Sequence, residues 1–322
     1  MVDVVLEVRD ARIPHSTCHP QVPLWIGSKP RLVVMNRQDM IARADRAAWD
    51  KHFTAEAAAA QAAADAKAAG KRKAAAARAA AAADSEQQHA AQVQQQEEEQ
   101  QQQQAQHEPE DAGPPPLPQQ VFWTDGKTGS GVHSLRRAAL KLSDHINAKR
   151  AKRGLAPRPV RAVVIGFPNI GKSALINRLL GRRVVESAAR PGVTRVLRWV
   201  RLGGELDLLD APGIIPAAFN DQAAAQALAI CNDIGEASYV DSLIAAAMII
   251  RIKTLPRNRP ILAALQRRYR ADPLSMSAED FVLHVAGEVF GGDAEKAGVR
   301  LLGDYRNGAL GEFALELPGM QH

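Results

Sequence analysis

Short apolar runs of strand length alternate with helical patterns along most of the chain. The runs are rich in β-branched residues, and each ends near a glycine, proline, asparagine or aspartate. They lie at Val2–Val8, Arg31–Met35, Gln120–Thr124, Val160–Ile165, Val196–Leu202 and Leu206–Leu209. Helical spacing follows several of them, notably at Ser134–Lys149 and Lys172–Leu180. This alternation predicts an α/β fold, a parallel sheet with helices on both faces, in which ligands bind at the carboxyl ends of the strands.

Beyond about residue 215 only helical spacing remains. Helices are predicted at Asp221–Cys231, Asp241–Ile252, Pro260–Tyr269, Ala278–Val289 and Ala294–Tyr305. Their expected N-caps are Asp221, Asp241, Ser277 and Asp293. The pattern predicts a small all-helical C-terminal domain over 215–322, beside a sheet domain formed by 1–54 and 119–214.

The segment 55–118, between the two parts of the predicted sheet domain, has a different composition. It opens with alanine runs, continues through a stretch of Gln and Glu at 94–104, and closes on prolines. With almost no large apolar side chains it cannot bury a core, although its alanine part favours transient helix. We therefore expect a disordered insertion.

Composition narrows the class of protein. The chain has 322 residues, of which 46% are hydrophobic, and its longest apolar run, Leu243–Ile250, is too short to cross a bilayer. Two cysteines exclude a disulfide scaffold and a zinc site built from cysteine alone, and they favour a reducing compartment. The net charge is +6; residues 55–120 hold 5 Lys and Arg against 10 Asp and Glu, so the remaining residues carry +11. Such a basic body favours a polyanionic partner.

The strongest chemical signal is GFPNIGKS, Gly166–Ser173, between a predicted strand and a predicted helix. It fits the phosphate-binding pattern G-x-x-x-x-G-K-[ST], in which backbone N–H groups point at a phosphate. Lys172 is expected to reach the β- and γ-phosphates, and Ser173 to bind Mg²⁺. The predicted nucleotide contacts are Pro168, Asn169, Ile170, Gly171, Lys172, Ser173 and Ala174.

Two further stretches complete the predicted phosphate and metal site. Asp210-Ala211-Pro212-Gly213 follows an apolar strand, so that Asp210 is placed to hold Mg²⁺ through water and Gly213 to offer its N–H to the γ-phosphate. Thr194, in the loop RPGVT, is expected to complete the Mg²⁺ shell. The predicted metal ligands are thus Ser173, Thr194 and Asp210.

A guanine reader is predicted upstream, at Asn36-Arg37-Gln38-Asp39, where GTPases commonly have Asn-Lys-x-Asp. The Asp39 carboxylate can accept two N–H bonds from guanine, which adenine cannot match. Asn36 is expected to brace the neighbouring loops, and the guanidinium of Arg37 to stack on the base. A loop after the third strand, with Thr124, Asp125 and Gly126, is expected to offer its backbone to guanine O6. Either stretch alone is also typical of an ordinary turn.

The order of these motifs is unusual, because in an ordinary GTPase the base readers come last. Here they precede the phosphate loop, which indicates a circularly permuted domain. The loop after Gly213 then leads directly into the helical domain. A shift of Gly213 that depends on the γ-phosphate is therefore expected to reach that domain.

With DARIP at Asp10–Pro14, these motifs in this order resemble the circularly permuted YlqF/RbgA-like GTPases, and most of all the plant chloroplast DAR GTPases. The resemblance covers about 1–53 and 120–322. It implies a monomeric, Mg²⁺-dependent GTPase that cycles between GTP and GDP and assists assembly of the large ribosomal subunit, with the precursor particle and its rRNA as partners. It also implies a chloroplast location, with the mitochondrion as the alternative. The basic tract Arg136–Arg161, with nine Lys and Arg against one Asp, suits RNA or a solvated helix face equally.

The chain departs from related GTPases at the catalytic position. Ile214 follows DAPG, where many GTPases place a Gln that orients water, and the family is similar in this. Relatives take a catalytic His from an N-terminal arm that these residues do not contain, so we assign no catalytic residue and expect the natural chain to begin further upstream. Asn169 resembles a K⁺-coordinating Asn of related GTPases. Two alternatives stay open, a GTP-gated rRNA binder that hydrolyses little GTP and an ATP-using enzyme.

Overall fold

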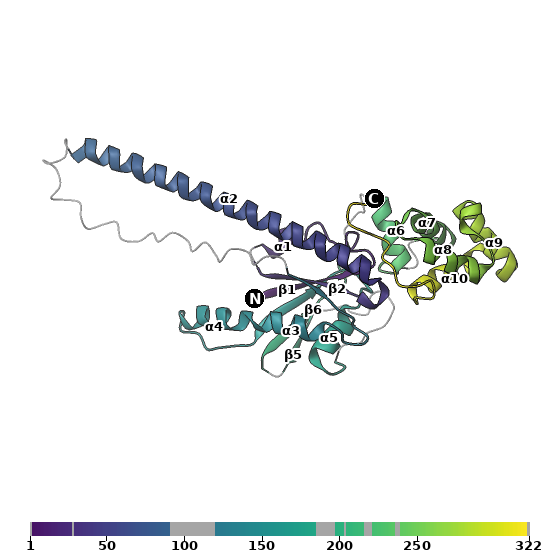
Figure 1. Cartoon of the computed structure of the whole chain (residues 1–322). Helices are drawn as coiled ribbons and strands as arrows, with labels where there is room; N and C mark the ends of the chain where they lie inside the picture. Colours follow the sequence, from purple (N-terminus) through teal and green to yellow (C-terminus); the bar gives the residue numbers. More distant parts are fainter. Residues whose placement is uncertain are drawn as a thin grey trace. The chain divides into compact units, whose positions relative to one another are not determined.

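The computed structural model describes residues 2–27, 29–90, 120–184, 197–202, 204–215, 221–235 and 239–320. The chain divides into two compact units, one formed by Met1–His52 with Gln119–His322 and the other by Phe53–Pro118. Helix α2, Arg43–Ala90, begins in the first unit and continues into the second (Figure 1). The expectation of disorder is therefore wrong for 55–90, where alanine, the residue with the highest helix propensity, forms most of the helix. The rest of that segment, 91–118, lies outside the described residues.

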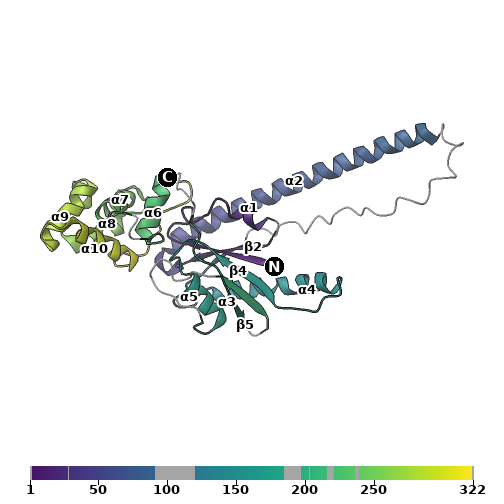
Figure 2. The ribbon, with the colours of Figure 1, turned by 180° about the vertical axis from the view of Figure 1, so that it is seen from behind.

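A six-stranded sheet in the order β3-β2-β1-β4-β6-β5 forms the centre of the first unit (Figures 1 and 2). Its strands are β1 Val4–Asp10, β2 Arg31–Asn36, β3 Gln120–Trp123, β4 Val160–Ile165, β5 Arg198–Leu202 and β6 Leu206–Asp210. All neighbouring pairs are parallel except β5 with β6. The predicted parallel sheet is thus confirmed for five strands and wrong for edge strand β5, because 203–205 are too few residues for the crossover that a parallel pair needs.

Helices cover both faces of this sheet, as expected. Helix α1, Val22–Ile26, and the start of α2 lie on one face, and the opposite face carries α3 Val132–Leu140, α4 Leu142–Ala151 and α5 Lys172–Leu180 (Figure 1). The single helix predicted at Ser134–Lys149 is two, α3 and α4, which meet at Lys141. Helix α3 buries Val132, Leu135 and Ala139, whereas α4 buries no residue. The division therefore coincides with the point where the chain leaves the core.

The central strand β1 is buried along its whole length. Its two interior charged residues are paired, with Arg9 Nε 2.7 Å from Glu7 Oε1, and Arg31 of β2 lies 3.2 Å from the other oxygen of Glu7. Such pairing is what lets charged side chains occupy a buried strand. The register sets Asp10 opposite Asn36, Met35 opposite Trp123 and Val164 opposite Asp210. The carboxyl ends of the five parallel strands therefore lie along one edge.

The remaining helices follow the sheet in the chain. They are α6 Gln222–Cys231, α7 Asp241–Thr254, α8 Arg259–Tyr269, α9 Ala278–Phe290 and α10 Ala294–Arg306, with short 3₁₀ turns at Gln38–Met40 and Pro273–Ser275. The predicted caps Asp221, Ser277 and Asp293 accept backbone N–H bonds at their helix starts. The cap predicted at Asp241 is wrong. Asp241 lies inside the first turn of α7, and its own N–H donates to Glu295, 3.0 Å away.

The segment after α10 fastens these helices to the sheet. Leu315 N donates to Arg12 O at 2.9 Å, His15 N donates to the Glu316 carboxylate at 2.8 Å, and Trp49 Nε1 donates to Glu316 O at 3.0 Å. The helical region, which the sequence suggested as a domain of its own, consequently belongs to the same compact unit as the sheet. Among the described residues, no helix combines the length and apolar character that a membrane crossing requires.

Candidate functional site

The phosphate loop, Gly166–Ser173, connects β4 to α5 at the carboxyl edge of the sheet. Its carbonyl oxygens are occupied by surrounding donors. Lys172 Nζ donates to Gly166 O at 3.1 Å and to Phe167 O at 2.6 Å, and Asn36 Nδ2 donates to Ile170 O at 2.7 Å. Because the C=O and N–H of a peptide unit point in opposite directions, this arrangement turns N–H groups toward the concave side, where an anion binds.

Lys172 carries the main positive charge of this loop. It is buried, and burial lowers the pKa of its amine to about 8, against the opposing effect of the Asp210 and Asp233 carboxylates. Within the part of the chain that the structure describes, the hydrogen bonds of the ammonium group go to two carbonyl oxygens of its own loop. A phosphate would offer it a much stronger partner.

Asn36, at the end of β2, joins the base reader to the phosphate loop. Besides its bond to Ile170 O, its Oδ1 accepts from Gly126 N at 3.0 Å and from Thr124 Oγ1 at 3.3 Å. A Cβ at Gly171 would lie 2.3 Å from Asn36 Nδ2, so only glycine permits this approach. The two stretches that the sequence placed around opposite ends of one nucleotide therefore lie side by side. The bracing role predicted for Asn36 is confirmed.

The side chain of Arg37 lies against the phosphate loop and two buried carboxylates. Its backbone is left-handed, with φ 63°, and its guanidinium donates to Asn169 O and lies 3.3 Å from Asp10 Oδ2 and 3.8 Å from Asp233 Oδ1. In this arrangement the guanidinium is engaged by protein groups, and its stacking on a base stays a prediction. The buried carboxylates attract the guanidinium toward the helical region, and the ion pairs offset the strain of a left-handed arginine.

The base loop also differs from expectation in detail. Gly126 N donates to Asn36 Oδ1, and the Asp125 carboxylate accepts from Lys127 N at 2.7 Å and Thr128 N at 3.1 Å. Thr124 and Asp125 are buried inside the loop, so their side chains support it rather than face a ligand. A contact from this loop to guanine O6 requires an N–H to exchange partners. Gly126 N–H, whose acceptor is a side chain, is the simplest donor to exchange.

Asp39 is exposed beside this loop, as a base reader must be. The partial burial of its carboxyl, together with the charge of Asp125, raises its pKa above the ordinary value. Two donors from guanine would relieve that unfavourable environment. A Cβ added at Gly126 would lie 3.2 Å from Ala174 Cβ, so Ala174 contributes by packing the start of α5 against the base loop.

Two of the three metal donors predicted from the sequence lie among the described residues. Ser173 lies in the first turn of α5, and Asp210 is buried at the end of β6, close enough to Lys172 for its charge to affect the lysine pKa. A hydroxyl and a carboxylate suit Mg²⁺, which takes few protein ligands and completes its shell with phosphate oxygens and water. Thr194 lies outside the described residues.

Gly213 packs directly on the phosphate loop. A Cβ at this position would lie 2.7 Å from Pro168 N and Cγ, and the next residue, Ile214, donates its N–H to Gly166 O at 3.0 Å. The DAPG segment is therefore docked where it would sense a γ-phosphate. Pro168 serves as the surface on which it rests.

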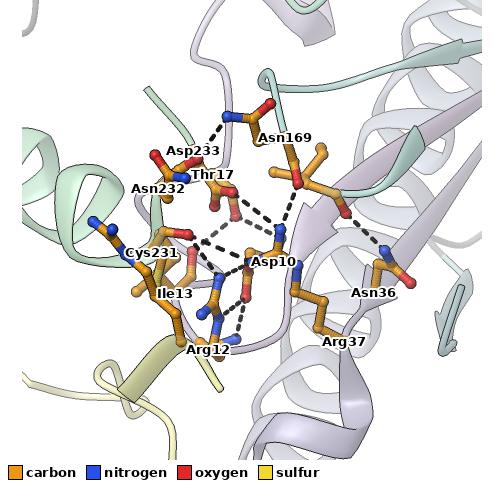
Figure 3. Close-up of polar contacts among 12 residues, drawn as sticks. Asp10, Arg12, Ile13, Thr17, Asn36, Arg37, Asn169, Cys231, Asn232 and Asp233 are labelled. Atoms are coloured by element: carbon orange, nitrogen blue, oxygen red, sulfur yellow. Dashed lines mark hydrogen bonds and ion pairs between the residues drawn. The ribbon is translucent and has the colours of Figure 1, made fainter. Parts of the chain in front are cut away.

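A buried polar cluster behind the phosphate loop was not assigned a role from the sequence (Figure 3). Arg12 forms two bonds with the Asp10 carboxylate, at 3.0 and 2.8 Å, and a third with Cys231 O at 3.0 Å. Burial alone would raise the pKa of Asp10, but the charges of Arg12 and Arg37 lower it below the ordinary value. Burial and the charge of Asp10 raise the pKa of Asp233 well above its ordinary value. The position of Asp10, level with Asn36 at a strand end, was the available signal; Asp233 gave none.

The same cluster reaches the helical region from the phosphate loop itself. Asn169 Nδ2 donates to Asn232 O at 2.9 Å, and Arg37 Nη1 lies 3.5 Å from Cys231 O, both at the end of α6 (Figure 3). Asn169 and Arg37, both in the predicted nucleotide site, thus contact the helical region directly. We call these two contacts, with the Arg37–Asp233 pair, the α6 latch.

Several known proteins are similar to this chain in sequence or in fold. The family model described as "50S ribosome-binding GTPase" matches residues 161–267. Ribosome biogenesis GTPase A of Bacillus cereus is 26% identical over 99% of this chain and 87% of its own length, and its counterpart from Priestia megaterium is 26% identical over 99% and 90%. The GDP-bound structure of YlqF from Thermotoga maritima matches with a TM-score of 0.54 at 19% identity, covering 99% of this chain and 96% of that one, which is a likeness of fold.

The phosphate loop, its neighbouring Asp210 and the adjacent Asn36–Asp39 stretch agree with these comparisons on one activity, the hydrolysis of GTP with Mg²⁺. Over nearly its whole length the chain is similar to ribosome biogenesis GTPases of the YlqF/RbgA type.

Proposed function

We propose that this GTPase assists assembly of the large ribosomal subunit, binding the precursor particle and its rRNA in a manner that depends on GTP. The observation that carries the proposal is the meeting of Asn36 with the phosphate loop, which builds one guanine-nucleotide site on a fold shared with YlqF. The names of its relatives, ribosome biogenesis GTPases, support the choice of partner.

The α6 latch supports gating of the helical region by nucleotide. Asn169 belongs to the loop that would surround the phosphates, and its partner carbonyl on Asn232 belongs to the helical region. A nucleotide that moves Asn169 must therefore alter a contact of α6. By reciprocity, a particle that moves α6 alters nucleotide affinity by the same factor.

We infer a circularly permuted order from the positions of the motifs. Asn36–Asp39 precedes the phosphate loop in the chain but adjoins it in space, as a base reader that normally follows would do. The test of this inference is a variant whose chain is reconnected in the ordinary order, with the base readers last, and whose folding and GDP affinity are compared with those of the natural chain. Unchanged GDP affinity supports it, and loss of folding contradicts it.

The experiment that tests the proposed function is single-turnover GTP hydrolysis with and without purified large-subunit precursors. A particle that binds the GTP-loaded protein and accelerates hydrolysis supports an assembly GTPase. A second candidate, a GTP-gated binder that hydrolyses little GTP, is favoured by Ile214, which cannot orient water as Gln does. Particle binding that depends on GTP without acceleration would identify that candidate. Absence of particle binding in either nucleotide state would reject both.

K⁺ is proposed as a further cofactor, held with help from Asn169. The side-chain atom that Asn169 uses toward Asn232 is Nδ2, so the oxygen that a cation needs is not the one in that bond. Faster hydrolysis in KCl than in NaCl is expected, and the difference should vanish in Asn169→Ala. Equal rates in both salts would contradict the proposal.

We propose a chloroplast location, supported by the resemblance to the chloroplast DAR GTPases. A fluorescent fusion to the natural full-length protein should accumulate in chloroplasts, and accumulation in mitochondria would identify the alternative.

We also propose a monomeric state, supported by the same resemblance. Light scattering after size-exclusion chromatography should give the mass of one chain, and twice that mass would contradict a monomer.

GDP affinity is expected to fall as the pH rises through the pKa of Lys172, about 8 in the ligand-free protein. Phosphate binds the charged amine, so affinity is constant below that pH and declines by about tenfold per unit above it. Calorimetric titration with GDP between pH of about 7 and 9.5 measures this decline. An affinity that rises or stays constant over that range would contradict the assignment of Lys172.

Gly213→Ala is expected to slow GTP hydrolysis by more than about tenfold while leaving GDP affinity nearly unchanged. The added Cβ would lie 2.7 Å from the backbone of Pro168, which forces the DAPG segment away from the phosphate loop. Gly303→Ala, where a Cβ meets open space, is the matched control and should hydrolyse GTP normally. Single-turnover rates of the two variants make the comparison; equal rates would place the γ-phosphate sensor elsewhere.

A further inference from the structure

The α4 arm, which we define as Lys141–Leu155, extends past the end of the sheet at which the N-terminus lies (Figures 1 and 2). Only Leu142 and Ile146, one turn apart, pack against the core, and they do so partly buried. No residue of α4 is buried, and the tip beyond Asn147 is exposed almost throughout. The fold therefore gains little from the second half of the arm.

The tip of the arm concentrates positive charge. Lys149, Arg150, Lys152 and Arg153 fill four of five consecutive positions, and Asp144 is the one acid of the arm. Lys149 lies in the last turn of α4, and Lys152 and Arg153 follow in the turn that ends the helix, three and four residues further along the chain. Like charges at these spacings in a helix repel by about 0.2–0.5 kcal/mol per pair. None of the three forms an ion pair with a residue that the structure describes. The positive cluster therefore does not stabilise the folded protein.

The arm is held firmly at its base. Asn147 Oδ1 accepts from Arg158 N at 3.1 Å, and the Arg158 guanidinium binds both oxygens of Asp3, at 2.6 and 2.8 Å. At the tip, Leu155 N donates to Arg150 O at 3.1 Å and Arg150 Nε to Ala156 O at 2.9 Å. The backbone that carries the three cations is consequently held in place, so binding a partner need not order it.

We propose that the α4 arm binds the phosphate backbone of duplex RNA through Lys149, Lys152 and Arg153. Choosing RNA among polyanions rests on the proposed function. The composition of the tip argues against other partners. It has no aromatic residue and no Met, whereas protein interfaces are enriched in aromatics and Met. Its one exposed apolar residue, Leu155, does not make the apolar stripe that a membrane-surface helix needs.

The arm and the nucleotide site lie at opposite edges of the sheet. Helix α3 starts beside the base loop, at the carboxyl edge, and the arm leads back into the first residue of β4 at the amino edge. No residue of the arm contacts the phosphate loop in the hydrogen bonds of the described residues. RNA bound at the arm should therefore add affinity for the particle and leave GDP affinity unchanged.

The test uses the full chain, a fluorescent RNA duplex of about 20 base pairs, and anisotropy over a range of salt concentrations. Lys149, Lys152 and Arg153 are all replaced by Gln. The expected result is a loss of more than about tenfold in duplex affinity and a salt-dependence slope smaller by about two to three, at unchanged GDP affinity. Arg43, Lys51 and Lys296 replaced together by Gln give the same change in net charge at scattered exposed positions, and should leave duplex affinity nearly unchanged. A variant with Lys149→Arg, Lys152→Arg and Arg153→Lys should retain binding.

Three results would overturn the proposal. The first is a Gln variant whose duplex affinity and salt-dependence slope equal those of the wild type. The second is an equal loss in the scattered control, which would mean that only net charge matters. The third is loss of precursor-particle binding with duplex binding intact, which would assign the arm to a ribosomal protein. Failure of the proposed function is separate, because it appears as absent particle binding by the wild-type protein whatever the duplex result.

Discussion

Lys172→Ala should weaken GDP and GTP binding by at least about 100-fold, equivalent to about 3 kcal/mol. The ammonium group is expected to bond to two phosphates, and each hydrogen bond to a charged group contributes about 1.5–3 kcal/mol. Among the described residues, Arg37 is the cation nearest in the site, and it is engaged with Asp10, Asn169 and Asp233. Equilibrium titration with a fluorescent guanine nucleotide measures the loss.

The same substitution should leave the ligand-free protein folded. Lys172 is buried with its pKa lowered to about 8, so its environment disfavours the charge that alanine removes. We expect a melting temperature within a few degrees of the wild type without nucleotide, and loss of the stabilisation that GDP gives. Lys127→Ala, an exposed lysine of the base loop, is the matched control and should bind nearly normally. Wild-type affinity in Lys172→Ala would end the phosphate-loop assignment.

Asp39→Asn should weaken GDP binding by about 100-fold and raise the affinity for xanthosine diphosphate. The carboxylate accepts two N–H bonds from guanine, each worth about 1.5–3 kcal/mol because the acceptor is charged. Asparagine replaces one of the two acceptor oxygens by an NH₂ group. This donor faces the guanine amino group unfavourably, but it can donate to the oxygen that xanthine has at that position. Competition of GDP, XDP and ADP against a fluorescent nucleotide measures the change in specificity.

Asp125→Asn is the control for that prediction. Asp125 lies in the adjacent loop, and its carboxylate already accepts the N–H groups of Lys127 and Thr128. Its substitution should weaken all three nucleotides alike, through the loop, without admitting xanthine. A change of base preference in Asp125→Asn, or an unchanged preference in Asp39→Asn, would move the base reader from Asp39 to the neighbouring loop.

The sequence predicted the strands, the phosphate loop and most helix starts because each of these depends on local chemistry. Strand β4 and helix α5 have the predicted bounds, since an apolar run that ends in glycine and a helix that starts after Gly171 need no distant contact. The antiparallel pairing of β5 was missed, although the three residues between it and β6 are too few for a parallel crossover. The division of α3 from α4 was also missed, because it depends on where the chain leaves the core, which periodicity does not record.

Sequence alone determined which chemistry this protein carries. Residue types at Asn36–Asp39, Gly166–Ser173 and Asp210–Gly213 specify a guanine nucleotide and Mg²⁺, because the shape of a phosphate loop and the donors and acceptors of a side chain are local properties. The tertiary structure decided how those parts are connected. It paired Arg37 with Asp10, and it set Arg12 against Cys231, 219 residues distant, and Asn169 against Asn232. Such contacts come from the packing of whole elements on one another, which the residues on either side of a motif do not encode.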